Sequence, residues 1–125
     1  MNRGRVATAL ALALLLPYAA RLPGVALFGA DWFLSYVPGV AAVLFMAAVN
    51  LVPAAALLAL AGSGGRLPFA LAAGFMGAAQ LALHGSLDLA SDSTAAVALV
   101  VFPVLAAIAA VLGWGLGWLV ARLRN

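Results

Sequence analysis

Long apolar runs separated by short polar segments dominate this chain. Such runs cover residues 37–61, 68–90 and 94–121, and a shorter one covers residues 6–20. A helix of about 20 residues is long enough to cross the roughly 30 Å hydrocarbon layer of a bilayer, so the three long runs predict membrane-spanning helices. With the shorter run as the first helix, the pattern predicts an all-α polytopic membrane protein. We expect an antiparallel bundle of four transmembrane helices that takes in residues 1–125 as one domain.

The first apolar run is the weakest of the four predictions. It has 15 residues without a charge, from Val6 to Ala20, before Arg21 interrupts it. A helix of that length is short for a bilayer, so we expect the Arg21 side chain to snorkel outward and the helix to extend toward residue 30. The run also follows two arginines, as a secretory signal does. Tyr18 is bulky where a cleavage site needs a small residue, which favours a retained helix over a cleaved one.

The polar breaks predict how the helices are connected. Residues 22–36 contain Pro23, Gly29 and the amphiphilic Asp31-Trp32 pair, which favours a short interfacial helix on the outer surface. The breaks at 62–67 and 90–93 are short, so helices two to four are predicted to be antiparallel neighbours. Ser91, Asp92 or Ser93 is expected to cap the N-terminus of the fourth helix.

Composition and charge support a membrane protein and indicate its orientation. The residues are 68% hydrophobic and only 7% charged, which excludes a water-soluble globule. All six basic residues are arginines, and five of them fall on one side of a four-span arrangement: Arg3, Arg5, Arg66, Arg122 and Arg124. By the positive-inside rule, both termini are predicted to be cytoplasmic. The alanine-rich, lysine-free composition favours a bacterial inner membrane. The net positive charge reflects a small number of acidic residues and not a basic patch, so nucleic-acid binding is not expected.

Small residues mark the faces on which membrane helices pack against one another. In the third helix one strip contains Ala70, Ala73, Gly77, Gln80, His84 and Asp88, while Leu71, Phe75, Ala82 and Leu89 lie on the face expected to contact lipid. In the fourth helix the small face contains Ala95, Ala106, Ala109, Gly113 and Gly117, opposite a β-branched face. The residues predicted to pack are therefore Ala73, Gly77, Ala106, Ala109, Gly113 and Gly117. Pro53 and Pro103 are expected to kink their helices.

Polar side chains within the predicted spans are the candidate functional residues. These are Asn50, Gln80, His84 and Asp88. Polar groups inside a bilayer normally face protein or water, because contact with lipid costs free energy. One hypothesis is a polar path, or a small binding site open to the outside, in which Asp88 orients or charges His84 and the other two residues supply neutral hydrogen bonds. The other, which we favour, is interhelical hydrogen bonding worth about 1 kcal/mol or less per contact. Arg21 and Asp31 are expected to pair at the outer surface.

The sequence carries no motif that names a reaction. There is no cysteine and only one histidine, so neither a metal site nor a cofactor is expected. No nucleophile is arranged beside His84 and Asp88, which disfavours an enzyme. We expect an accessory or structural subunit of a membrane complex, with the bilayer and a second copy or another membrane protein as partners. The alternative is an oligomeric transporter or channel component for a small solute, an ion or protons that uses Gln80, His84 and Asp88.

Overall fold

The computed structural model describes residues 2–91 and 93–125, and all their regular structure is helical. The elements are α1 (Arg3–Leu10), the π-helix η1 (Ala11–Leu15), α2 (Leu16–Ala19), α3 (Leu22–Phe28), α4 (Asp31–Leu34), α5 (Val40–Ala61), α6 (Arg66–Ser86) and α7 (Ala95–Leu123). Four stretches are long and apolar enough to cross a membrane: Arg3–Phe28, Val40–Ala61, Arg66–Ser86 and Ala95–Leu123. The all-helical prediction and the four apolar helices are therefore confirmed.

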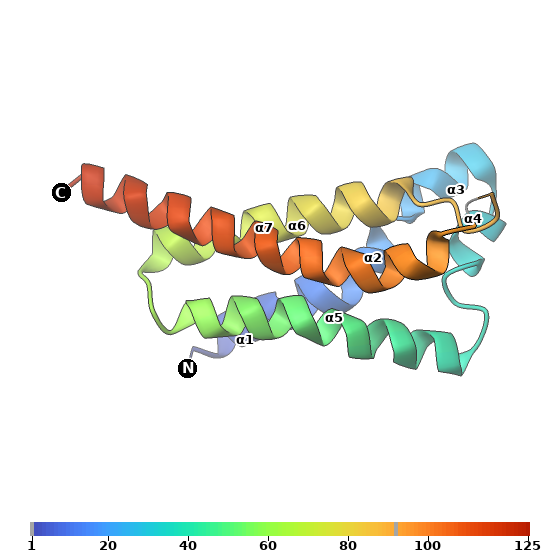
Figure 1. Ribbon diagram of the computed structural model, residues 1–125, viewed down its shortest axis with the longest axis horizontal. Helices are drawn as coiled ribbons and strands as arrows, with labels where there is room; N and C mark the ends of the chain where they lie inside the picture. Colours follow the sequence, from blue (N-terminus) through green and yellow to red (C-terminus); the bar gives the residue numbers. More distant parts are fainter. Residues whose placement is uncertain (1, 92) are drawn as a thin grey trace.

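The long helices run side by side along the longest axis of the molecule (Figure 1). Both chain termini and the α5–α6 loop lie at one end, which we call the terminal end. The short helices α3 and α4 lie at the opposite end with the α6–α7 loop, and we call this the distal end. The prediction places both termini on one side of a membrane, and this arrangement is compatible with it.

The helices do not all pack against their neighbours in the sequence. Helix α7 makes its most extensive contact with α6 and its next with α5, while the first helical stretch contacts both α5 and α6. Consecutive helices α5 and α6 touch far less. Helices α5 and α6 are thus in contact, as expected, but their contact is much smaller than the contact of either helix with α7.

Alanines fill the interior of the bundle toward the terminal end. The apolar cluster there consists of Ala9, Ala13, Ala54, Leu57, Ala72, Met76, Ala106 and Ala110, contributed by all four long stretches. Without a hydrophobic drive between helices in lipid, close packing of small side chains is what stabilises such contacts. Every buried member of this cluster is an alanine, a leucine or a methionine, so it contains no polar side chain.

Two glycines allow α7 to approach α6 closely. A Cβ atom at Gly113 would lie 2.9 Å from the Phe75 Cβ and would also clash with the Leu71 backbone. A Cβ at Gly117 would lie 2.6 Å from the Pro68 Cα. The flank of α6 at Leu71 and Phe75, expected to contact lipid, therefore packs in part against α7. The expected strip is also displaced, because Ala70 is exposed and the buried positions are Pro68, Ala72, Met76, Gly77, Gln80 and His84.

The first helical stretch contains a wide turn. Pro17 has no N–H group and its ring excludes a normal α-helical bond to the carbonyl four residues earlier. The chain widens into the π-helix Ala11–Leu15 immediately before it. The helix then turns at Ala20 and Arg21 into α3, which ends at Gly29 with a φ of 85°. Two short helices, α3 and α4, thus replace the single interfacial helix expected over residues 22–36.

Two predicted helix boundaries need correction. The third helix was expected to reach Ala90 but ends at Ser86, and Leu87 is extended. The Asp88 carboxylate accepts hydrogen bonds from the N–H groups of Ala90 and Ser91, which favours a turn over continued helix. Thr94 occupies the N-cap position of α7, in place of Ser91 or Ser93, and Asp92 lies outside the described residues. The proline residues Pro53 and Pro103 lie inside the continuous helices α5 and α7.

Candidate functional site

Buried polar side chains gather between the middle of the bundle and its distal end. Arg21, Asn50, Gln80 and His84 are each at most 1% exposed. They come from the turn after α2, from α5 and from α6, so they belong to three different helical stretches. We call these four residues, with Tyr36 beside them, the polar cluster. Of the residues predicted as polar candidates, the cluster includes Asn50, Gln80 and His84.

Asn50 and Gln80 join α5 to α6 through the interior. The Gln80 Nε2 donates to the Asn50 Oδ1 at 3.0 Å, and the Asn50 Nδ2 donates to the Met46 carbonyl at 2.9 Å. This link crosses between two helices that otherwise touch little. The Gln80 Oε1 has no hydrogen-bond partner among the described residues. The pair is uncharged, so the link avoids the cost of burying an ion.

His84 lies between aromatic rings. The Tyr36 hydroxyl is 3.2 Å from the His84 Nδ1, and the rings meet edge to face with centroids 5.8 Å apart. Phe102 contacts the imidazole edge to face as well, at 5.3 Å between centroids. The His84 Nε2 is buried without a hydrogen-bond partner in the described part of the chain. Tyr36, and not the expected Asp88, is thus the group that orients His84.

Arg21 turns inward rather than toward the surface. Its Nε and Nη2 donate to the Trp32 carbonyl at 3.1 and 2.6 Å, and its Nη1 donates to the His84 carbonyl at 3.1 Å and to the Leu87 carbonyl. The Ser35 hydroxyl lies 3.5 Å from the Nη2. The guanidinium also stacks over the Trp32 and Tyr36 rings, 3.9 and 4.2 Å from their centroids. The expected snorkelling of Arg21 and its pairing with Asp31 are therefore wrong.

The acceptors of Arg21 explain why a buried cation is tolerated. The last carbonyls of an α-helix lack intrahelical partners and form the negative end of the helix dipole. The His84 carbonyl belongs to that last turn of α6, and the Leu87 carbonyl follows it. Arg21 therefore caps the C-terminus of α6 with its guanidinium and joins that end to α4 through the Trp32 carbonyl.

Asp88 lies apart from the other three predicted polar residues. It follows α6 in the loop, where the Ser91 hydroxyl donates to its Oδ2 at 2.7 Å. That hydrogen bond, with those from the Ala90 and Ser91 N–H groups, holds the pKa of Asp88 below its ordinary value. Asp88 and Asp31 line a surface cavity of about 210 Å³ together with Arg21 and Trp32. The two carboxylates thus line the same cavity as Arg21, and His84 is not part of its lining.

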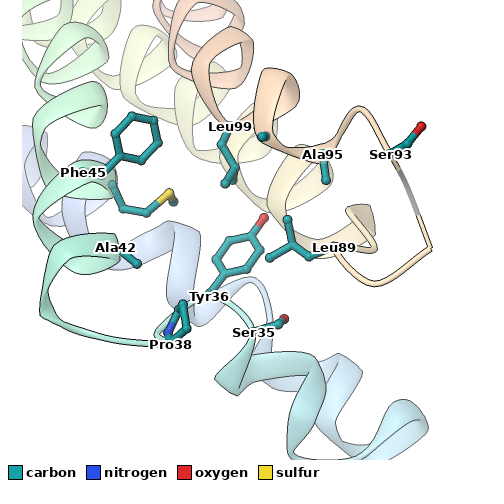
Figure 2. A pocket seen from close by; sticks show the side chains of 11 residues that line it. Ser35, Tyr36, Pro38, Ala42, Phe45, Leu89, Ser93, Ala95 and Leu99 are labelled. Carbon is teal, nitrogen blue, oxygen red and sulfur yellow. The ribbon is translucent and has the colours of Figure 1, made fainter.

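An apolar pocket adjoins the polar cluster at the distal end. Its volume is about 400 Å³, and its walls come from the segment before α5, from the start of α5, from the α6–α7 loop and from the start of α7. The lining residues are Ser35, Tyr36, Pro38, Ala42, Phe45, Met46, Leu89, Ser93, Ala95, Ala96 and Leu99. Figure 2 shows the Tyr36 hydroxyl directed toward the gap between Leu89 and Leu99. Burial raises the pKa of Tyr36 to about 12, so its hydroxyl stays protonated at neutral pH.

The sequence pattern missed both Arg21 and Tyr36 as interior residues. Arg21 was expected at the surface because it interrupts an apolar run, and Tyr36 ends the segment that was expected to form an interfacial helix over residues 22–36. The available signal was a single arginine followed within 15 residues by Trp32 and Tyr36, the aromatic faces on which it stacks. Within the described residues, no group of three His, Cys, Asp or Glu side chains could hold a metal ion.

Comparison with protein-family models, with curated proteins and with solved structures finds no match to this chain.

Proposed function

We propose that this chain is an integral membrane protein of the bacterial inner membrane with four spans and both termini in the cytoplasm. The four long apolar stretches support the spans. The terminal end holds both chain termini and the α5–α6 loop (Figure 1), and five of the six arginines belong to these parts of the chain. The sixth, Arg21, is buried and bound to carbonyls, so it does not oppose the positive-inside assignment.

Within that membrane we propose a non-catalytic accessory or structural role. The observation that carries this proposal is the apolar cluster at the terminal end, where Ala13, Leu57 and Met76 are fully buried. A path for a solute or a proton along one copy of the chain needs polar groups or water on both sides of the midplane. The described polar cluster stops where this apolar cluster begins. The hydrogen bonds of Asn50, Gln80 and Arg21 then stabilise the bundle.

The proposal assigns the partner contact to helix faces that the bundle leaves uncovered. Gly113 and Gly117 already pack against α6, so their small face is used within the chain. The exposed face of α7 presents Val97, Val100, Val104, Ile108 and Val111. The partner is a second copy or another membrane protein whose helices contact such a face. Lipid covers whatever the partner leaves free.

Photo-crosslinking in intact cells tests the accessory role. A benzophenone amino acid placed at Val104 of α7, or at Val52 of α5, projects from a half-exposed position, whereas Ala110 is a buried control. The proposal expects a discrete protein adduct at one or both exposed positions and none at Ala110. Adducts with lipid alone at both exposed positions would contradict a partner on these faces.

An oligomeric transporter or channel component is the second candidate. The observation that favours it is that two buried atoms of the polar cluster, the Gln80 Oε1 and the His84 Nε2, have no hydrogen-bond partner in the described part of the chain. Flux into proteoliposomes distinguishes the two roles. The accessory role expects proton and small-ion flux equal to that of empty vesicles. A flux that Gln80→Leu or His84→Ala abolishes would establish transport instead.

A further inference from the structure

The apolar pocket has one polar group at its buried end. Tyr36 is 2% exposed, and its hydroxyl lies among the lining side chains, on the side of Leu89 and Leu99 (Figure 2). A phenol has one donor hydrogen and can also accept hydrogen bonds. The contact with the His84 Nδ1 uses only part of this capacity. The hydroxyl can therefore form a second hydrogen bond with a molecule in the pocket. It accepts that bond if it donates to His84, and it can donate that bond if the His84 Nδ1 carries the proton.

The walls exclude a charged occupant. None of the described lining residues carries a charge, and the polar ones besides Tyr36 are Ser35 and Ser93. The Arg21 guanidinium lies over the ring of Tyr36 and lines the separate cavity with Asp31 and Asp88. Transfer of an ion into such a pocket without a partner costs several kcal/mol. The occupant is therefore uncharged.

The shape of the pocket fits an amphiphile. Its volume of about 400 Å³ is in the range of small-molecule sites. Phe45 and Ala96 are exposed at its rim on the long helices, whereas Ser35 and Ser93 are exposed at the loop side. An apolar body can enter between α5 and α7, and its oxygen can lie near the hydroxyl groups.

We propose that this pocket binds an uncharged amphiphile that bears a hydroxyl or carbonyl oxygen, with this oxygen hydrogen-bonded to Tyr36. The apolar part of the ligand packs against Phe45, Met46 and Leu99. This site is independent of the accessory role, because it depends only on the pocket and its lining.

Methyl NMR of the labelled methionines tests binding directly, with 4-hexylphenol as the probe and the protein in detergent micelles. Met46 lines the pocket, while Met76 lies in the apolar cluster and serves as an internal control. The proposal expects a saturable shift of the Met46 methyl signal and no shift of the Met76 signal. Shifts of both signals that rise linearly with the probe would indicate general partitioning into the micelle and would contradict the site.

A matched pair of variants in α5 locates the site. Ala42→Phe fills the pocket, whereas Ala48→Phe adds the same ring at an exposed position of the helix that does not line it. We expect Ala42→Phe to weaken binding of 4-hexylphenol at least tenfold and Ala48→Phe to leave it within twofold. Equal affinity for the two variants would overturn the assignment of the pocket.

Two comparison probes test the chemistry. One net hydrogen bond of about 1 kcal/mol corresponds to roughly a fivefold change in affinity, so Tyr36→Phe is expected to weaken 4-hexylphenol by about that factor. The same variant should leave 4-hexyltoluene, which lacks the hydroxyl, unchanged. The carboxylate 4-hexylbenzoate should bind the unaltered protein at least tenfold more weakly than 4-hexylphenol. Equally tight binding of the carboxylate would overturn the conclusion that the ligand is uncharged.

Discussion

At the scale of single residues, Arg21 shows how this bundle accommodates a buried charge. Its guanidinium meets three backbone carbonyls and two aromatic faces, and the Asp88 carboxylate adds a favourable field from the surface. The planar guanidinium directs several donors into one plane, whereas a lysine ammonium is a compact, strongly hydrated charge. The stacking and the set of carbonyls therefore specify arginine rather than any cation.

Replacing Arg21 by lysine keeps the charge and removes the planar group. We expect Arg21→Lys to lower the free energy of unfolding by about 2 kcal/mol, because hydrogen bonds to a charged group are lost in the interior. Denaturant titration in detergent, monitored by tryptophan fluorescence, measures the change. Arg124→Lys at the exposed C-terminal end is the control and should shift stability by less than about 0.5 kcal/mol. Similar effects of both substitutions would show that the buried site does not require the guanidinium of Arg21.

Tyr36 gives the bundle a defined response to alkaline pH. Burial raises its pKa to about 12, above the ordinary value of 10.0. Between these values the unfolded chain loses the phenolic proton and the folded chain keeps it, so the stabilisation present below pH 10 decreases as the pH rises to 12. The decrease approaches about 2 kcal/mol at pH 12. Unfolding curves at pH 9, 10, 11 and 12 should show this loss in the unaltered protein but a smaller slope in Tyr36→Phe. Identical slopes would contradict the burial of the phenol.

At the scale of helices, the small residues of α7 and the arginines of the first stretch determine the packing. Gly113 and Gly117 bring α7 onto the backbone of α6. Arg5 donates to the carbonyls of Ala61 and Gly64 at the C-terminal end of α5, as Arg21 does at the end of α6. The first stretch therefore caps the C-termini of two other helices, one at each end of the bundle.

Alanine substitution of neighbouring glycines tests the close approach of α6 and α7. Gly113→Ala places a Cβ against Phe75 and the Leu71 backbone, so we expect a loss of about 1–3 kcal/mol from overpacking. At Gly115 a Cβ meets nothing within 4 Å, so Gly115→Ala should be neutral or stabilising by up to about 1 kcal/mol. Thermal unfolding in detergent measures both variants. A loss at Gly115 as large as at Gly113 would refute the packing.

Local pattern predicted the helices well but not their partners. Apolar runs placed α5 and α7 within a few residues of their observed bounds, and the small face of α7 followed from the spacing of Gly113 and Gly117. The end of α6 was misplaced because Asp88 forms a local turn, which apolar periodicity does not register. The weak contact between α5 and α6 depends on residues far apart in the sequence. The inward orientation of Arg21 is missed for the same reason, since its acceptors lie up to 66 residues away.

At the scale of the whole molecule, the interior has two parts with different chemistry. An alanine-rich apolar cluster fills the terminal end, and polar side chains with an adjoining pocket occupy the middle and the distal end. The Asn50–Gln80 hydrogen bond lies among the buried side chains between α5 and α6, which otherwise make few contacts with each other. The proposed accessory role draws on the apolar part, and the proposed ligand site on the pocket at the distal end.

The Asn50–Gln80 link is expected to act as a true coupling between α5 and α6. Asn50→Leu, Gln80→Leu and the double variant form a thermodynamic cycle, and the coupling free energy should be about 0.5–1.5 kcal/mol, as for other hydrogen bonds between membrane helices. Equilibrium unfolding in detergent provides the three differences. Additive effects of the single variants would contradict an energetically coupled pair.

The four-span arrangement is tested most directly by finding on which side of the membrane each end of the bundle lies. The chain has no cysteine, so single cysteines at Ser63, Ser91 and Asn125 report position without background. In intact spheroplasts, a membrane-impermeant maleimide should label Ser91→Cys at the distal end, and should label Ser63→Cys and Asn125→Cys only after permeabilisation. Labelling of Ser63→Cys and Ser91→Cys from the same side, or of Ser63→Cys and Asn125→Cys from opposite sides, would contradict the four-span bundle.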